Sequence, residues 1–220
     1  MTFYYHPREV AAHGAASATV FLMNEAPGPS EAESGIPSFG LQGANIYHAL
    51  RKANINWAIS TPSFVWPRGE GQTERHRLKE EFLRLRANHM TCSNAYSRWP
   101  RSNSTAKGFL HPKAPDVLSS KNIDRIQREV RTSNHHILLV CGKFAYLACT
   151  GREIFKPSSI ESTPLTLIEL QNINVRLQSG FQEAWYMGHT RRWLTHAEKT
   201  VGALHSISAS AAWQLSTGKA

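Results

Sequence analysis

One short stretch constrains the fold of this chain more than any other. An apolar run, Val20–Met23, stops at Asn24-Glu25, and a Pro-Gly turn follows at once. A short apolar run bounded by turn residues is typical of a strand that is buried on both faces, as in parallel sheets. In open parallel α/β sheets, ligands bind beyond the carboxyl ends of the strands. The sequence therefore predicts a ligand site at the end of this strand, with an amide and a carboxylate in it.

The residues that follow extend this pattern into a longer motif. From Asn24 to Gly43 the order is N-E-A-P-G-x-x-E-x-x-x-G-x-P-x-x-G-x-x-G, and it leads into a helical run, Ala44–Ala53. Apart from Asn24, which stands in place of a glycine, this order resembles the first active-site motif of the uracil-DNA glycosylase superfamily, closest to its bacterial and archaeal branches. The resemblance implies an enzyme that flips a nucleotide out of DNA and hydrolyses its N-glycosidic bond.

Predicted strands alternate with helical patterns along the rest of the chain, which favours a parallel sheet covered on both faces. We expect one domain over residues 1–220, an α/β fold of the uracil-DNA-glycosylase type. This is a three-layer α/β/α sandwich with a central, mostly parallel four- to five-stranded sheet. The predicted strands are Ala18–Met23, Trp57–Ser60, Met90–Ala95, His136–Cys141 and Ala184–Met187. The predicted helices include Glu74–Ala87, Asn122–Arg131 and one that opens at Thr195, and the predicted long loops are Pro62–Gln72 and Arg98–Ser119.

The charge of the chain indicates its partner. The 25 Lys and Arg residues exceed the 16 Asp and Glu residues, so the formal net charge of the 220 residues is +9. Such an excess serves solubility or attracts a polyanion through counterion release from its phosphates, and we expect DNA as the partner. No apolar run is long enough to cross a bilayer and no signal peptide is evident, so we expect a monomer in the cytoplasm.

The resemblance assigns two catalytic residues. Glu25 occupies the acid position of the first motif, where the superfamily's carboxylate holds or activates water and stabilises positive charge on the sugar. His189 follows an apolar strand and Gly188, as the histidine of the superfamily's last motif does, and would stabilise the departing base anion. In the superfamily Pro and Ser usually follow this histidine, whereas Thr190 follows it here. Either residue alone would be an ordinary turn or structural side chain, so the prediction depends on their joint placement.

Other residues are assigned to the base and to the DNA backbone. Asn94 begins an N-x5-P spacing at a strand end that resembles the superfamily's second element, and its amide offers a donor and an acceptor side by side. The segment Leu138–Ala145 resembles the family's strand–Gly–helix unit, in which we expect Gly142 to be scaffold. The candidate base-binding residues are Asn24, Ala26, Ser38, Phe39 and Asn94. The candidate DNA-binding residues are Arg98, Arg101, Lys107, Arg191, Arg192 and Trp193, with the tryptophan as a wedge that fills the gap left by the flipped base.

Several departures from the superfamily pattern bear on cofactors and mechanism. The close branches often hold an iron–sulfur cluster on four cysteines, but this chain has three scattered ones. No H-E-x-x-H motif or Cys/His tetrad is present, so we expect no metal and no cofactor. None of the three motifs contains a lysine, which predicts monofunctional hydrolysis without a covalent protein–DNA intermediate.

The wall of the base pocket bears on the substrate. In close relatives an aromatic residue follows the motif proline and stacks on uracil, whereas here Ser38 follows Pro37 and Phe39 comes one place later. Together with Asn24, this favours a base bulkier or more polar than uracil. One example is the hydroxymethylated or glucosylated cytosine of some phage DNA, whose excision would serve antiviral defence. The alternatives are uracil or another deaminated base in repair, and a catalytically inactive DNA-binding protein on the same fold.

Overall fold

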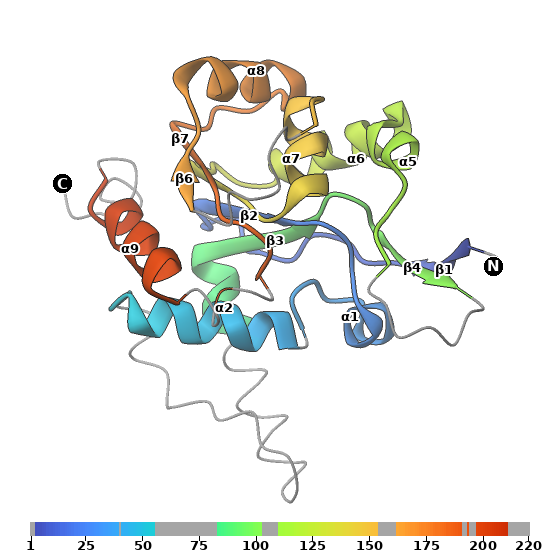
Figure 1. Cartoon of the computed structure of the whole chain (residues 1–220), viewed down its shortest axis with the longest axis horizontal. Coiled ribbons are helices and arrows are strands. Elements are labelled where there is room, and N and C mark those ends of the chain that lie inside the picture. Colours follow the sequence, from blue (N-terminus) through green and yellow to red (C-terminus); the bar gives the residue numbers. More distant parts are fainter. Residues whose placement is uncertain are drawn as a thin grey trace, which may run out of the picture.

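The centre of the molecule is a five-stranded sheet (Figure 1). The computed structural model describes residues 3–39, 41–55, 83–102, 110–153, 162–190, 193 and 197–210. The strand order is β3-β2-β5-β7-β6, in which the first four strands are parallel and β6 is antiparallel to β7. The strands span Met90–Asn94 (β3), Val20–Asn24 (β2), Ile137–Val140 (β5), Glu183–Tyr186 (β7) and Thr163–Pro164 (β6). The chain is therefore an α/β protein with a mixed, mostly parallel sheet.

Helices cover both faces of this sheet, as the alternation of side chains along β2 requires. Val20 and Leu22 pack into one apolar cluster with α2 (Leu41–Lys52) and α9 (Ala197–Ser208). Phe21 and Met23 pack into a second cluster, to which the helices of the opposite side contribute. Those helices are α5 (Ala114–Leu118), α6 (Ser120–Val130), α7 (Lys143–Thr150) and α8 (Leu167–Leu177). Figure 1 shows the two groups of helices on opposite sides of the strands, an arrangement consistent with three layers.

Four of the five predicted strands are confirmed, with their ends shifted by one or two residues. Strands β2 and β5 are short apolar runs that the structure buries throughout, as strands covered on both faces should be. Strand β3 is also buried, although its sequence Met-Thr-Cys-Ser-Asn is not an apolar run. The predicted helix Asn122–Arg131 is confirmed as α6. The predicted strand Trp57–Ser60, the loop Pro62–Gln72 and most of the predicted helix Glu74–Ala87 lie outside the described residues, although residues 83–89 are helical.

The prediction of one long loop over Arg98–Ser119 is wrong at both of its ends. Residues Arg98–Ser102 form β4, which pairs antiparallel with β1 (Phe3–Glu9) in a separate two-stranded sheet, and α5 lies before Ser119. Strand β4 contains Pro100, which cannot donate to a ladder and is confined to edge strands, and it has two arginines in place of an apolar run. Its partner β1 is distant in sequence, so no local pattern marked either strand.

Helix α8 was not predicted, although its start has a recognisable signal. The Thr166 side chain accepts a hydrogen bond from the Glu169 N–H, and the Glu169 carboxylate accepts one from the Thr166 N–H. This reciprocal capping box is encoded by the T-x-x-E spacing, which marks a helix start. In the described parts of the chain, none of the helices has the length and apolar character needed to cross a membrane.

Candidate active site

Four residues that the sequence motifs singled out lie at the carboxyl edge of the parallel sheet. Glu25 follows β2, and Asn94 ends the neighbouring strand β3, where it stands in register with Asn24. Gly142 follows β5 and His189 follows β7. Because parallel strands end at the same edge, residues more than 160 positions apart, such as Asn24 and Thr190, come within hydrogen-bond distance. The site therefore occupies the place that the sequence indicated.

Glu25 lies at the centre of this group. Its side chain is only 3% exposed, and it is held at both carboxylate oxygens. Oε2 accepts a hydrogen bond from Nδ1 of His111 at 2.9 Å and lies 3.9 Å from Nε2 of His189. Oε1 accepts from the backbone N–H of Phe144 at 3.3 Å, at the start of α7. The carboxylate is thus fixed between two imidazoles and a helix N-terminus.

These partners determine the ionisation of Glu25. Burial by itself raises the pKa of a carboxyl group, because it disfavours the charged form. Here the hydrogen bond from His111 and the charges of His189 and His111, together with the Phe144 N–H, outweigh burial and lower the pKa of Glu25 below its ordinary value of 4.5. The buried group is therefore a carboxylate at neutral pH, which is the state that a general base requires.

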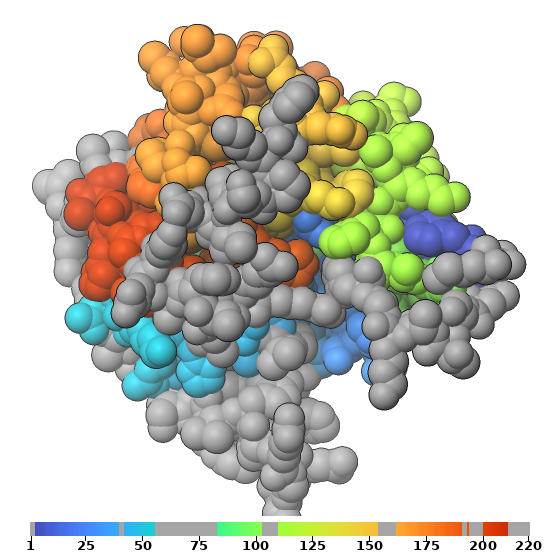
Figure 2. Space-filling view, in the orientation of Figure 1, coloured from blue at the N-terminus to red at the C-terminus, as the bar shows by residue number. Residues whose placement is uncertain are grey.

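His111 is a site residue that the sequence did not reveal. It lies between β4 and α5, and its side chain is 40% exposed while it bonds to the buried Glu25. Its ring stacks on that of Phe144, with centroids 5.4 Å apart and planes inclined by 29°. In Figure 2 yellow-green atoms, from the part of the chain after residue 110, lie beside blue atoms of the N-terminal part, and the bond between His111 and Glu25 joins these two parts. A lone histidine in a stretch rich in lysine and proline shows no local pattern, so only the contact identifies it.

Gly142 brings the backbone against Glu25. Its φ is +96°, in the region that favours glycine, and a Cβ there would lie 2.4 Å from Oε1 of Glu25 and 2.7 Å from its Cδ. Contacts this short require displacement of the carboxyl group. The expectation that Gly142 is only scaffold therefore misses that its lack of a side chain makes room for the catalytic candidate.

If the site excises a base, as the resemblance implies, Gly142→Ala should lower single-turnover excision by about 10- to 100-fold, because a displacement of the order of 1 Å costs about 10²-fold. The measurement is single-turnover excision together with the thermal unfolding midpoint. Gly151→Ala is the matched control: it also has positive φ, at +72°, at the other end of α7, but its Cβ would meet Arg176. If both variants lose excision equally, backbone strain rather than displacement of Glu25 is responsible.

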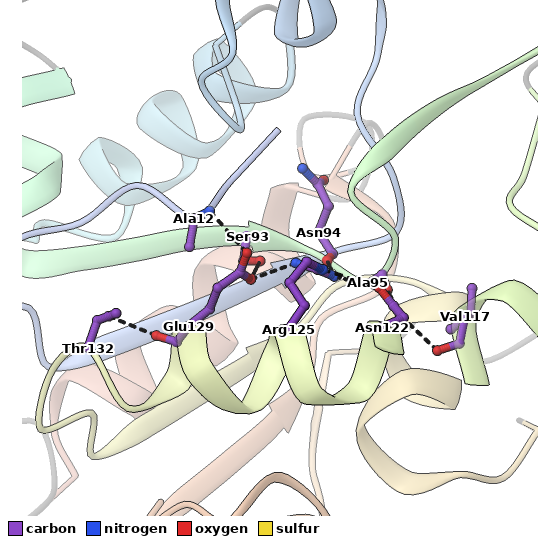
Figure 3. A network of polar contacts seen from close by, with 9 residues as sticks. All are labelled: Ala12, Ser93, Asn94, Ala95, Val117, Asn122, Arg125, Glu129 and Thr132. Carbon is purple, nitrogen blue, oxygen red and sulfur yellow. Dashed lines mark hydrogen bonds and ion pairs between the residues drawn. The ribbon is translucent and has the colours of Figure 1, made fainter. Parts of the chain in front are cut away.

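Asn94 presents an amide without a partner. The residue is fully buried, and among the described residues neither its Nδ2 nor its Oδ1 makes a hydrogen bond. Figure 3 shows its side chain directed away from α6, while its carbonyl oxygen faces Arg125. A buried polar group without a partner is costly and calls for an explanation, such as a ligand that it binds. The amide offers a donor and an acceptor together, which suits the edge of a base.

A network of polar side chains fixes the backbone around Asn94 (Figure 3). The guanidinium group of Arg125 donates to the Asn94 carbonyl at 2.7 Å and to Glu129 at 2.6 Å. Glu129 also accepts from the Ser93 hydroxyl at 2.5 Å, and Asn122 donates to the carbonyl of Ala95 at 2.7 Å. Arg125 and Asn122 thus bind the backbone carbonyls of Asn94 and Ala95, and none of these bonds uses the Asn94 side chain. The strand end is therefore held rigidly while its amide stays available.

Asn24 and Ser38 are engaged with each other rather than directed at a ligand. The Asn24 Nδ2 donates to the Ser38 hydroxyl at 2.8 Å, and its Oδ1 accepts from the Thr190 hydroxyl at 3.3 Å. Ser38 has a left-handed φ of 56° and donates its N–H to Glu31 at 2.5 Å. Both side chains thus brace the turn between β2 and α2. The remaining base-binding candidates are Ala26, which is buried, and Phe39, which is half-buried.

Glu31 has a structural function in this turn. Its two carboxylate oxygens accept from the N–H groups of Gly28 and Ser38, one on each side of α1 (Pro29–Ser34). A carboxylate that closes the start of a helix in this way satisfies backbone donors that would otherwise have no partner. The second acid of the motif therefore holds the loop in shape, whereas Glu25 bonds to His111 and lies close to His189.

The DNA-binding candidates have different surroundings. Arg98 is paired with Glu9 at 2.8 Å on the surface. The guanidinium carbon of Arg101 lies over the rings of Tyr4 and Trp99, at 5.4 and 4.7 Å from their centroids. Lys107, Arg191 and Arg192 lie outside the described residues.

The interpretation of Trp193 as a wedge is not supported by its position. The residue is 1% exposed and packs with α2 and α9 in the apolar cluster on that face of the sheet. Its indole N–H donates to the carbonyl of Met187 at 3.0 Å, which satisfies its one polar atom. A residue that enters DNA must be exposed, so Trp193 is a core residue. The basic residues beside Trp193 favoured a position at the surface, but its burial depends on α2 and α9, and α2 is distant in sequence.

No cluster of three or more metal-ligating side chains occurs among the residues that the structure describes. The three cysteines are buried and free, and burial raises the pKa of each thiol. Comparison of the chain with protein-family models and with curated protein sequences gave no match. The function is therefore argued from the geometry of the site.

Proposed function

We propose that the protein is a DNA glycosylase that flips a base out of DNA and hydrolyses its N-glycosidic bond to leave an abasic site. The observation that carries the proposal is the meeting of three chemically distinct groups at one sheet edge. They are a buried carboxylate, two imidazoles in contact with or close to it, and a buried amide without a partner. A glycosylase of the uracil-DNA glycosylase type needs these three kinds of group.

Glu25 would act on the sugar side of the bond. As the bond from C1′ to the base nitrogen breaks, its electron pair leaves with the base and positive charge develops on the sugar. The Glu25 carboxylate stabilises this charge and accepts a proton from the water whose oxygen bonds to C1′. Its lowered pKa keeps it ionised, and the hydrogen bond from His111 fixes its orientation.

His189 and Asn94 would act on the base. An imidazole N–H directed at a base carbonyl stabilises the negative charge that the departing base acquires. The Asn94 amide would pair with the edge of the base through one donor and one acceptor. Burial strengthens both interactions, because few water molecules compete with them. The excess of positive charge supplies affinity for the phosphates.

The substrate we propose first is a modified pyrimidine, since the small Ser38 stands where the branches of the superfamily that the motif resembles have a stacking aromatic residue. The bond between Asn24 and Ser38 removes the other argument for a polar or bulky base, because Asn24 already has partners. Uracil is therefore the second candidate substrate. An assay of base excision from defined oligonucleotides distinguishes the modified pyrimidine from uracil.

The test is incubation of the protein with oligonucleotides that carry one uracil, 5-hydroxymethylcytosine, glucosylated hydroxymethylcytosine or ordinary base, followed by alkaline cleavage of abasic sites. We expect cleavage at one modified or deaminated base in the wild type and none with Glu25→Gln purified in parallel, which controls for contaminating glycosylases. A protein–DNA adduct that survives SDS gel electrophoresis would contradict hydrolysis without a covalent intermediate. Absence of cleavage for every base would contradict the proposal and favour an inactive DNA-binding protein.

Asn94→Leu should separate function from stability. Excision should fall by about tenfold or more, while the free energy of unfolding stays equal or rises by up to about 1–3 kcal/mol, because a buried amide without a partner is removed. The measurements are single-turnover excision and denaturant unfolding. Asn122→Leu is the matched control: its amide donates to Ala95 and Val117, so the variant should lose stability. A stability loss in Asn94→Leu as large as in the control would mean that Asn94 is structural.

A further inference from the structure

The two-stranded sheet of β1 and β4 has one face made of rings and a guanidinium group. Tyr4 is paired with Arg101 across the strands, and the Arg101 guanidinium lies over the rings of both Tyr4 and Trp99. The ring of His6 lies 6.1 Å from that of Trp99, at an angle of 34°. We call Tyr4, His6, Trp99 and Arg101 the aromatic–arginine face. Tyr4 is 37% exposed, and the other three are half-buried.

The opposite face of this small sheet is anchored beside the candidate active site. The Tyr5 hydroxyl donates to Asp116 at 2.6 Å and accepts from the Lys113 N–H at 3.0 Å. The Tyr5 ring also packs on that of Tyr96, with centroids 4.6 Å apart. Lys113 is two residues from His111, and Tyr96 is two residues from Asn94. The small sheet that carries the aromatic–arginine face is therefore anchored to the segments that carry both site residues.

The charge of this face suits a nucleic acid. No carboxylate belongs to this face. The single acid of β1 and β4 is Glu9, and it is bonded to Arg98. Because Arg98 precedes Trp99 directly along β4, its side chain points to the opposite face. Flat rings beside a guanidinium group form the kind of platform on which bases stack without regard to sequence. In a duplex the faces of the bases are hidden in the stack, so such a platform favours an unpaired strand.

We propose that the aromatic–arginine face binds an unpaired stretch of the DNA strand that enters the active site, with bases on Trp99 and Tyr4 and phosphate at Arg101. The inference deepens the proposed function and rests on it, because a glycosylase must hold a nucleotide that has left the stack. It implies that the protein binds single-stranded DNA more tightly than an abasic strand of equal length. It also makes β1 and β4 part of the DNA interface, although they lie outside the main sheet (Figure 1).

The test is fluorescence anisotropy with three labelled probes: a short oligothymidylate, an abasic oligomer of the same length and a matched duplex. Trp99→Leu should weaken oligothymidylate binding by about 5- to 150-fold, which is the worth of stacking one base. Tyr4→Leu, at a more exposed position, should act in the same direction. Both should bind the abasic oligomer and the duplex within about twofold of the wild type, because leucine removes only the flat ring.

Arg101→Ala should weaken binding of every probe, whereas Arg131→Ala, an exposed arginine at the end of α6, is the charge control and should change none. Thermal unfolding midpoints show whether each variant is folded. Equal affinity of Tyr4→Leu and the wild type for oligothymidylate, or an equal loss on the abasic oligomer, would overturn the inference. Excision assays distinguish this inference from the proposed function. If the wild type excises no base but shows the expected stacking pattern in the binding assays, the inference about the aromatic–arginine face stands and the proposed glycosylase activity is refuted.

Discussion

Glu25→Gln should lower single-turnover excision by about 10²- to 10⁴-fold and leave DNA affinity nearly unchanged, as expected for loss of a general base. Glutamine keeps the shape of the side chain and an oxygen for the His111 hydrogen bond, but it has no negative charge to stabilise the sugar or to accept the proton of water. Single-turnover kinetics and binding titrations with the same oligonucleotide measure the two effects. Glu33→Gln, at an exposed position of α1, is the matched control.

The pH profile gives a second measure of the same carboxylate. Because the pKa of Glu25 is lowered, excision by the wild type should persist down to pH values below 4.5, as far as the protein stays folded. His111→Ala removes the contribution that lowers this pKa most and leaves the raising effect of burial. The acid limb of the variant should therefore lie at higher pH. An unshifted acid limb, or a Glu25→Gln variant with the parental rate, would refute the assignment.

His189→Ala should lower single-turnover excision by about 10²- to 10³-fold, which is the usual cost of removing one donor from a site that stabilises a developing anion. The loss should be smaller for a substrate whose departing base forms a more stable anion, as 5-fluorouracil does compared with uracil. A purely structural histidine would not produce this dependence. His205→Ala, on α9, is the control, and His189→Gln, which keeps an N–H donor, should recover part of the rate.

The parallel sheet could be predicted because its inner strands β2 and β5 are short apolar runs buried on both faces, and because the predicted strands alternate with helical patterns. Strands β1 and β4 could not, because their pairing joins Tyr5 to Pro100 across nearly a hundred residues and neither strand has an apolar run. The capping box of Thr166 and Glu169 was a usable signal for α8. The α/β class therefore follows from local patterns, whereas the small second sheet depends on contacts between distant segments.

The candidate site shows the same division. Glu25, Asn94 and His189 each follow or end a predicted strand, and parallel strands bring their ends together without further information. His111 lies in a stretch with no periodic pattern and reaches Glu25 from 86 residues away, so only the fold reveals it. Trp193 was assigned to the surface because its neighbours are basic, yet its environment is set by α2 and α9. Strand ends are thus predictable, and residues that loops supply to the same site are not.

The amide of Asn94 affects the stability of the protein when no ligand is bound. A folded chain that keeps a desolvated donor and acceptor without partners is less stable than it would be with a molecule bound to them. A free nucleobase of the right shape would satisfy both atoms. Since it binds only the folded state, it would raise the melting temperature by an amount that grows with the logarithm of the ratio of its concentration to its Kd. The base preference of the proposed site is thus readable from melting curves with free bases, before any DNA is cut.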